Sequence, residues 1–410
     1  MTNTLIQQNA GIVARGLAAT ISANLSFCKN ISKQDSSIYD GTNGFSPGAT
    51  VYIPKPARYI PQNTLDITSS IQAVSEEKVP LTLDIISTVG VSLTSLELSS
   101  DINLKSVINR INDQAGVSIA HDIEKQMIKK ATQYTYNQVG TAGSTNYGIS
   151  TILAARTKVN KFLCPTDGDR TLLLEGDASA AAVEARAGLF NASSKIASQY
   201  ENGAIGRADG FNWYENELLY NHTNGNDVTG VTVKTTSIAG ATTLAVSGLT
   251  TTTGTVKKGQ VFTVAGIYAV NPQTRDTYNF LQQFTVTADA TADGSGDATL
   301  SISPTIYSST SGGLQNVSGF PTAANAIVFS GAASTAYRQS LAFHKKAFRM
   351  VSVPLEMPRN AEFSAQATEQ GITVQIVREM DVRTREWITR VDFLGGLAIE
   401  RPEWACRITS

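Results

Sequence analysis

The stretch KKGQVFTVAGIYAVNPQTRDTYNFLQQFTVTADATADGSGDATLSISP, residues 257–304, carries the clearest fold signal in the chain. Short runs of β-favouring residues alternate in it with Gly, Asp and Ser clusters, a pattern typical of a small antiparallel β unit. It lies inside a block, residues 221–330, with 22 threonines and only 9 charged side chains. The flanking segments have ordinary globular composition, so we interpret the block as an inserted domain. Its predicted strands are residues 231–233, 260–264, 284–287 and 298–302.

Two unusual segments open the chain. Between Leu5 and Leu25 apolar residues recur at helical spacing with a single charge, Arg15, which predicts a helical arm that needs a partner surface. Residues 44–86 then hold five prolines around strand-like runs. Proline confines strands to sheet edges, and a two-stranded excursion cannot bury its own apolar face. We therefore expect these strands, residues 50–53 and 79–85, to lie on another surface, such as that of a second subunit.

A long amphipathic helix is predicted next. Apolar positions three or four residues apart extend from an N-cap at residues 99–101 to about Tyr134. Glu124 falls on the charged face, where it would form an ordinary polar pair with His121. Gly116 is a candidate point of bending.

A compact α/β lobe is predicted to follow, because short helical and strand-like pieces alternate after residue 148. Its predicted elements are a helix at 149–158, a strand at 170–175, an Ala-rich helix at 178–189 and a loop at 202–210.

The host chain resumes near Ala336. Residues 337–350 are predicted as helix and turn, and residues 372–379 and 387–399 as long strands joined by an exposed hairpin end. Proline has no amide hydrogen to donate, so Pro402 breaks the ladder and residues 403–408 should form a separate final strand.

The composition excludes several classes of function. Lys plus Arg (33) balances Asp plus Glu (34) over 410 residues, whereas tight DNA binding needs a strongly basic surface. The three cysteines lie far apart, which indicates neither a disulfide framework nor a zinc site. No stretch approaches the ~18 apolar residues that cross a bilayer, and no secretory signal is recognised. We therefore expect a soluble protein made in a cytoplasm.

The motifs of common enzyme classes are missing. The chain has no P-loop, no GxGxxG after a strand, no GxSxG and no HExxH. The three histidines, His121, His222 and His344, fall in three different predicted elements. No catalytic residue, metal or cofactor is therefore expected.

Two polar clusters in the block favour turns over sites. Asp289, Asp293 and Asp297 resemble a calcium loop in composition, but their spacing is not the alternating ligand pattern, and a hairpin turn explains them better. Lys257 and Lys258 precede Gly259 as a polar turn, and a nucleic-acid contact there is the less favoured interpretation.

This order of elements resembles the major capsid proteins of tailed double-stranded DNA phages, more narrowly the coat proteins of short-tailed phages with an inserted domain. The resemblance covers nearly the whole chain. It is carried by VPLTLD (79–84), by the stretch 257–304 quoted above, by LAFHKKAFRMVSVPLEMP (341–358) and by RVDFLGGLAIERPEWACRI (390–408).

The resemblance implies the α+β fold of that family, called the Hong Kong ninety-seven fold. The implied parts are an N-terminal arm (1–45), an E-loop (46–86), a peripheral domain (87–140 and 359–400) with a spine helix at about 100–135, an axial domain (141–220, 334–358 and 401–410) and an inserted antiparallel β-barrel accessory domain (221–333).

The resemblance also implies a function and partners. The chain would self-assemble, as pentamers and hexamers, into an icosahedral head around packaged double-stranded DNA, with a scaffolding protein and a portal protein. It would touch DNA only non-specifically, contact no membrane, be made in the host bacterial cytoplasm and end in the virion. Whether a decoration protein binds is left open. Between Val231 and Lys257 the chain is short and nearly uncharged, where the best-known relative has a long charged loop, so we expect no shell-holding salt bridges from the insertion.

Two sets of residues are hypothesised to make the assembly contacts. Charges of the E-loop would meet spine or hairpin charges of a neighbour, through Lys55, Arg58, Glu76, Glu77, Lys78, Lys129 and Asp381. The arm would face the scaffolding protein through Leu5, Ile12, Leu17 and Ile21.

Three other readings stay open. An encapsulin-like compartment protein would share the fold. An α/β enzyme with a β-domain insertion would place its site near Asp167, Asp169, Glu175 and Asp177, residues that fit turns and caps better. A surface-layer or adhesin protein fits the Thr-rich block but not the missing export signal.

Overall fold

The computed structural model describes residues 3–34, 50–56, 76–94, 104–144, 147–185, 206–309, 314–358 and 361–409, with isolated residues between 48 and 71; the side chains of the first two long helices are described from Val13 and from Gln114 onward. The chain forms two compact units. Unit 1 comprises Met1–Ile53, Val79–Ile128 and Phe348–Ala398, and unit 2 comprises Pro54–Lys78, Lys129–Ala347 and Ile399–Ser410.

Unit 1 is built on a six-stranded sheet whose order is β1-β19-β22-β21-β20, with β4 also paired to β22. The antiparallel pair β21 and β22 is in register from Gln375 opposite Asp392 to Asp381 opposite Glu386, which confirms the predicted long hairpin. The strands are β1 (Ser32–Gln34), β4 (Ile85–Thr94), β19 (Phe348–Ser352), β20 (Phe363–Glu369), β21 (Ile372–Asp381) and β22 (Glu386–Ile399).

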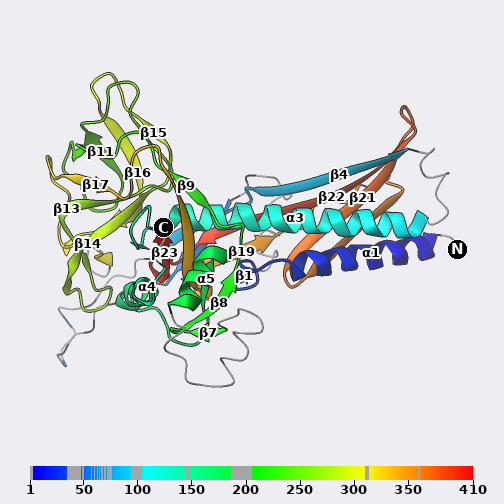
Figure 1. The fold of residues 1–410 in the computed structure, drawn as a ribbon, viewed down its shortest axis with the longest axis horizontal. Coiled ribbons are helices and arrows are strands. Elements are labelled where there is room, and N and C mark those ends of the chain that lie inside the picture. The colour runs from blue at the N-terminus through cyan, green and yellow to red at the C-terminus, as the bar shows by residue number, and fades with distance from the viewer. Residues whose placement is uncertain are drawn as a thin grey trace. The chain divides into compact units, whose positions relative to one another are not determined.

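The helical arm, α1 (Asn3–Ala23), packs within unit 1 against β20 and β21 and lies beside the long helix α3 (Leu104–Tyr134), as Figure 1 shows. Leu17 and Ile21 are buried on this contact, and a Cβ at Gly116 would lie 2.8 Å from Leu17 Cδ1. Gly116 therefore lets the two helices approach closely. The partner surface that the sequence predicts for the arm is therefore supplied, for its described part, by its own subunit.

A buried carboxylate fastens the end of the arm. Glu124 of α3 is fully buried and accepts hydrogen bonds from the amides of Ser26 (2.9 Å), Phe27 and Cys28 (3.3 Å). A carboxylate stabilises such a turn because it satisfies several amides that the helix end leaves without partners. The predicted polar pair with His121, which is exposed, was wrong because Glu124 lies on the apolar side of α3.

The two-stranded excursion consists of β2 (Thr50–Lys55) and β3 (Glu77–Thr82), close to the predicted limits. Apolar side chains of both strands are covered. Ile53 and Leu81 are buried in one apolar cluster with Val351, Val353 and Leu394 of unit 1. The chain itself therefore supplies a surface for part of this excursion.

Unit 2 contains a second sheet, of order β5-β23-β18-β6-β8-β7 with β9 on β18. Two helices, α4 (Ile149–Lys161) and α5 (Gly176–Glu184), share an apolar core with it. The strands are β5 (Gln138–Val139), β6 (Arg170–Leu174), β7 (Arg207–Ala208), β8 (Phe211–Glu215), β9 (Asn221–Thr223), β18 (Ala336–His344) and β23 (Ala405–Thr409).

One predicted element has the wrong type. Residues 337–350, expected as helix and turn, form strand β18, a single 3-10 turn η3 (Lys345–Ala347) and the start of β19. These residues form a strand and not a helix because β18 is buried on both faces between β23 and β6. Continuous apolar runs suit such a central strand. Residues 348–352 were expected to group with the lobe of residues 141–220, but β19 pairs in the sheet of unit 1.

The inserted block folds as a six-stranded sheet of order β10-β11-β16-β14-β13-β17 with its own apolar core. The amide of Val233 donates to Asn325 O and that of Ile327 to Val231 O, so the two outer strands of the sheet are joined and the sheet closes into a barrel. The strands are β10 (Thr232–Val233), β11 (Ala241–Ser247), β13 (Val261–Val270), β14 (Thr277–Val286), β16 (Ala298–Ile306) and β17 (Ile327–Phe329), with a separate pair β12 (Thr255–Val256) and β15 (Ala290–Thr291).

The contact at Gly116 gives a testable prediction. Gly16 of α1 is exposed, and a Cβ there would meet nothing within 4 Å. Gly16→Ala should raise the free energy of unfolding by up to about 1 kcal/mol, the usual helix preference of Ala over Gly. Gly116→Ala should cancel that gain or lower stability by about 1 kcal/mol, because its methyl overpacks Leu17. Urea unfolding of the purified subunit measures both.

A double variant tests the contact between Gly116 and Leu17 itself. Leu17→Ala should cost less in the Gly116→Ala background than alone, since the methyl fills part of the space that Leu17 leaves. Equal stabilisation by Gly16→Ala and Gly116→Ala would contradict the assigned contact.

Candidate functional site

The candidate site of this chain is a set of surfaces and joints, and its centre in unit 2 is the buried guanidinium of Arg407. From β23 it donates to Thr135 O (2.6 Å) at the end of α3, to Gly259 O (2.7 Å) and to Thr285 Oγ1 (3.0 Å) of the barrel. Burial lowers the pKa of Arg407 to about 9. One side chain therefore joins the end of the long helix, the final strand and the barrel.

Amide side chains reinforce the same joint. Gln283 of β14 accepts from the Gln138 amide (2.9 Å) and donates to Gln138 O (3.0 Å), so it extends β5 as a strand would. The hydroxyl of Thr285 donates to Gln133 O (2.9 Å). The barrel is therefore an integral part of unit 2 and not a tethered appendage.

Two lysines of α4 contact aromatic rings of the barrel. Lys158 Nζ lies 4.0 Å and Lys161 Nζ 4.6 Å from the centroid of Phe280, which stacks on Tyr278. The Tyr278 hydroxyl donates to Lys161 O (2.7 Å). Burial, followed by repulsion from Lys161, lowers the pKa of Lys158 to about 8. Desolvated cations over ring faces add stabilisation to this contact.

Part of the hypothesised E-loop charge set is paired inside unit 2. Arg58 Nη2 lies 2.9 Å and Lys55 Nζ 3.6 Å from the buried carboxylate of Glu403, and Lys55 Nζ also lies 3.4 Å from Glu77. Burial alone would raise the pKa of Glu403, but Lys55 and Arg58 outweigh it and hold that pKa below its ordinary value.

The remaining charges of that set are differently placed. Glu76 and Lys78 are exposed and form no ion pair within the described part of the chain. Lys129 lies 5.9 Å from the ring centroid of Tyr220. Asp381 accepts from the amide of Arg383 (2.8 Å) at the tip of the β21–β22 hairpin. Their contacts with a neighbouring subunit stay a prediction.

The hypothesised scaffold-facing residues divide in the same way. Leu17 and Ile21 are buried inside unit 1, so in this conformation they are not available to a partner. Leu5 and Ile12 lie outside the described side chains. Among the described side chains of α1, from Val13 onward, the exposed ones are small residues around Arg15.

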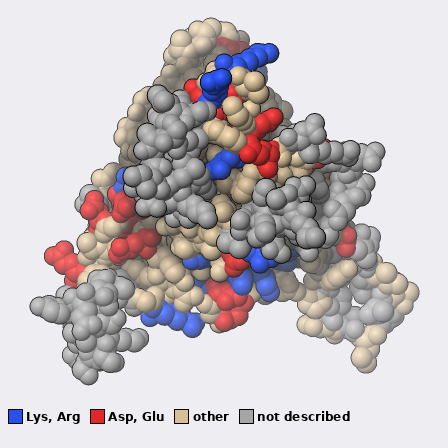
Figure 2. Space-filling model, turned by 90° about the vertical axis from the view of Figure 1, so that its right-hand side faces the viewer, with Lys and Arg blue, Asp and Glu red and all other residues tan. Residues whose placement is uncertain are grey.

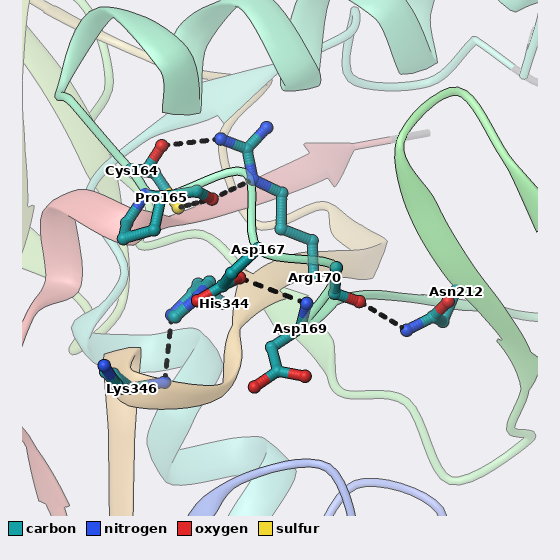
Figure 3. A network of polar contacts seen from close by, with 9 residues as sticks. Cys164, Pro165, Asp167, Asp169, Arg170, Asn212, His344 and Lys346 are labelled. Atoms are coloured by element: carbon teal, nitrogen blue, oxygen red, sulfur yellow. Dashed lines mark hydrogen bonds and ion pairs between the residues drawn. The ribbon is translucent and has the colours of Figure 1, made fainter.

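The acidic cluster of the lobe serves structure (Figure 3). Asp167 binds His344 Nε2 at 3.0 Å, while the Lys346 amide donates to His344 Nδ1 (3.1 Å). Burial alone would raise the pKa of Asp167, but the hydrogen bonds from His344 and the Asp169 amide outweigh it and hold that pKa below its usual range. With Nδ1 accepting, the neutral imidazole has a proton only on Nε2, so both nitrogens are engaged.

The other predicted acids also have structural roles. Glu175 occupies the N-cap position of α5 and pairs with Arg338, and Asp177 lies in the first turn of that helix. In the barrel, Asp293 accepts from the amides of Ser295 (2.8 Å) and Asp297 (3.0 Å), which confirms the predicted turn.

In the described ranges no helix is long and apolar enough to cross a membrane. No group of three or more His, Cys, Asp or Glu side chains is arranged for a metal ion among the residues that the structure describes. On the face seen in Figure 2, Lys and Arg lie among Asp and Glu, without one continuous basic field among the coloured residues.

The contacts described above are buried joints between elements and exposed charged surfaces. Over residues 2–407 the chain matches the family of the P22 coat protein, gene protein 5, and it belongs to that family. It is accordingly a phage major capsid protein with the tailed-phage capsid fold, it forms the shell of the virion, and it is not an enzyme.

Solved structures give similar but distant matches. A chain of Mycobacterium phage Che8 is 12% identical with a TM-score of 0.46, covering 94% of this chain and 90% of the other. The capsid of Ralstonia phage GP4 is 8% identical with a TM-score of 0.47, covering 94% and 88%. A virus-like particle from Pyrococcus furiosus is 8% identical with a TM-score of 0.40, covering 97% of each chain. No curated protein matches the sequence.

Removing the Arg407 guanidinium should loosen the joint that it makes. Arg407→Met leaves two buried carbonyls and a hydroxyl without their donor, so the free energy of unfolding should fall by about 3 kcal/mol or more. Arg383→Met, at an exposed position of the hairpin tip, should change it by less than about 0.5 kcal/mol. Urea unfolding of both variants checks this, and equal effects would contradict the assigned role.

His222 gives a pH dependence. Burial, followed by the charge of Arg407, lowers its pKa from 6.5 to about 4. Between these values the unfolded chain binds a proton that the folded chain does not, so stability falls as pH falls, by on the order of 3 kcal/mol.

The variant His222→Gln removes this proton linkage. Its loss of unfolding free energy between pH 7 and pH 4.5 should be about 2 kcal/mol smaller than that of the unmodified chain. His121→Gln, at an exposed histidine, is the matched control. A loss as large in His222→Gln as in the control would show that His222 titrates normally.

Proposed function

We propose that this coat protein assembles, together with a scaffolding protein, into an icosahedral head of pentamers and hexamers that includes a portal and encloses double-stranded DNA. Family membership supports the shell, and the placement of the β2–β3 excursion supports how neighbours join. The host bacterial cytoplasm is the proposed place of synthesis, and contact with DNA is proposed to be non-specific.

The observation that carries the joining mechanism is the division of charges on the excursion. Lys55 and Arg58 are held by Glu403 within the same chain. Lys78 of β3 and Glu76, just before that strand, are exposed and have no ion-pair partner in the described ranges. The first group fixes the excursion to its own subunit, which leaves the second group for a neighbouring subunit.

Exposed charges suit contacts that recur at slightly different angles. Each such ion pair is worth only about 0–1 kcal/mol, so a shell needs many of them and tolerates the loss of one. Identical subunits in five- and six-neighbour surroundings need this tolerance. We propose that Glu76 and Lys78 select the neighbouring subunit, and that Glu403 holds the excursion in place by pairing with Lys55 and Arg58.

Charge reversals at the two positions should separate assembly from folding. Lys78→Glu should leave the unfolding free energy of the subunit within about 0.5 kcal/mol of the unmodified value but reduce closed shells. Arg58→Glu places a second carboxylate beside Glu403 and should cost the subunit about 1–3 kcal/mol. Electron microscopy after co-expression with the scaffolding protein counts the shells, and urea unfolding measures stability.

The outcomes distinguish the parts of the proposal. Normal closed shells from Lys78→Glu would contradict the role of Lys78, and unchanged stability in Arg58→Glu would contradict the internal pair. A chain that forms no closed particle with any scaffolding protein would contradict the proposed function as a whole.

The scaffold is proposed to bind the exposed face of α1 around Arg15, since Leu17 and Ile21 are buried. Arg15→Glu should then reduce scaffold-directed assembly while the subunit stays folded. Lys29→Glu, an exposed cation beyond the end of α1, is the control. Pull-down of each variant by immobilised scaffolding protein measures binding, and equal retention of both would contradict this surface.

A further inference from the structure

A cleft in unit 2 collects positive charge from three lysines. Its volume is about 510 Å³, within the range of small-ligand sites. Three ammonium groups line it, from Lys129 of α3 and from Lys257 and Lys258 in the turn before β13, against one carboxylate, Asp289. Tyr220, Thr223, Asn224 and Gln133 form the remaining wall.

The lysines are held by rings more than by carboxylates. Lys258 Nζ lies 4.9 Å from the ring centroid of Tyr134, and Lys129 Nζ lies 5.9 Å from that of Tyr220. Neither has a carboxylate within ion-pairing distance in the described ranges. A ring face orients an ammonium without cancelling its charge, so the cleft keeps its positive potential.

Asp289 is already occupied by the turn that it stabilises. It accepts from the amide of Lys258 (2.7 Å), and its other oxygen lies 3.6 Å from Lys257 Nζ. One carboxylate shared in this way offsets one of three cations. The cleft therefore carries a net charge of about +2, which suits a multivalent anion.

We propose that this cleft is a binding site for a phosphate-bearing anion, either a free polyphosphate or the backbone of nucleic acid. A phosphate group offers several acceptor oxygens and up to two negative charges, which the three lysines that line the cleft can share, whereas a single carboxylate offers one charge. The exposed Thr223 hydroxyl adds a further donor on the wall.

Occupation of the cleft has a structural consequence. Lys129 belongs to the long helix and Lys258 to the barrel, so one anion in contact with both ties the two parts of unit 2 together. An anion that binds only the folded chain raises its stability according to its concentration relative to Kd. Arg407 connects the long helix to the barrel in the interior of unit 2, and a bound anion would connect the same two parts at the surface.

The test is isothermal titration of the full-length subunit with pyrophosphate at constant ionic strength. We expect saturable binding, weakened at least about tenfold in Lys129→Gln/Lys258→Gln, since charge-assisted hydrogen bonds are lost. Lys125→Gln, an exposed lysine one turn earlier on α3, should bind as the unmodified chain does. Asp289→Asn should bind more tightly, about two- to fivefold, because a repelling charge is removed.

The double lysine variant should weaken binding and Asp289→Asn should strengthen it. If the double variant folds poorly, Asp289→Asn still tests the site, because it retains every lysine. Absence of saturable binding, equal weakening by Lys125→Gln, or weaker binding by Asp289→Asn would each overturn the proposal. Competition by a short DNA duplex would assign the phosphate to nucleic acid. Pyrophosphate binding that the duplex leaves unchanged would assign it to a free polyphosphate.

Discussion

The hydrogen bonds of one buried guanidinium hold unit 2 together. Arg407 reaches the last turn of α3, the turn before β13 and strand β14 at the same time, and no carboxylate is found beside it in the described residues. A buried cation without a counter-charge is costly unless its donors are all used, so these carbonyls and the hydroxyl must stay in place. This requirement fixes the barrel to the lobe and makes the inserted domain part of the subunit that enters the shell.

The arm shows the same principle in unit 1. Gly116 allows α1 and α3 to approach, and Glu124 then satisfies the amides that follow α1. Because the described apolar side chains of the arm, such as Leu17 and Ile21, are buried within its own unit, we assign its contacts with other proteins to exposed polar positions. For a coat protein this division is useful, since the internal contacts of each unit stay in place while weak surface charges adapt to different neighbours.

The sequence predicted much of this fold because period and proline signals are local. The limits of α3, β6, β21, β22 and the final strand lie close to those predicted, since helical spacing or an interrupting Pro402 marks them. Residues 337–350 are predicted as helix and turn but form mostly strand, because a strand buried on both faces lacks the polar–apolar alternation that would reveal it. Strands β11 and β20 were not predicted at all.

The site was harder to predict because its residues act across long separations. Glu124 lies four residues after Ala120 and three before Met127, so a charge within the apolar stripe was a usable signal that was read as polar surface. Arg407 stands in a wholly buried strand, but its partners lie far away in sequence and could not be inferred. The pairing of Arg58 with Glu403 has the same long-range origin.

Hydrogen–deuterium exchange of the free subunit and of assembled shells tests the account most directly. Amides of residues 135–139, next to the Arg407 and Gln283 contacts, should be protected equally in both states, while those of residues 76–79 should gain protection only in shells. Fast exchange of residues 135–139 in the free subunit, followed by protection on assembly, would show that the barrel docks only in the shell and would contradict the account.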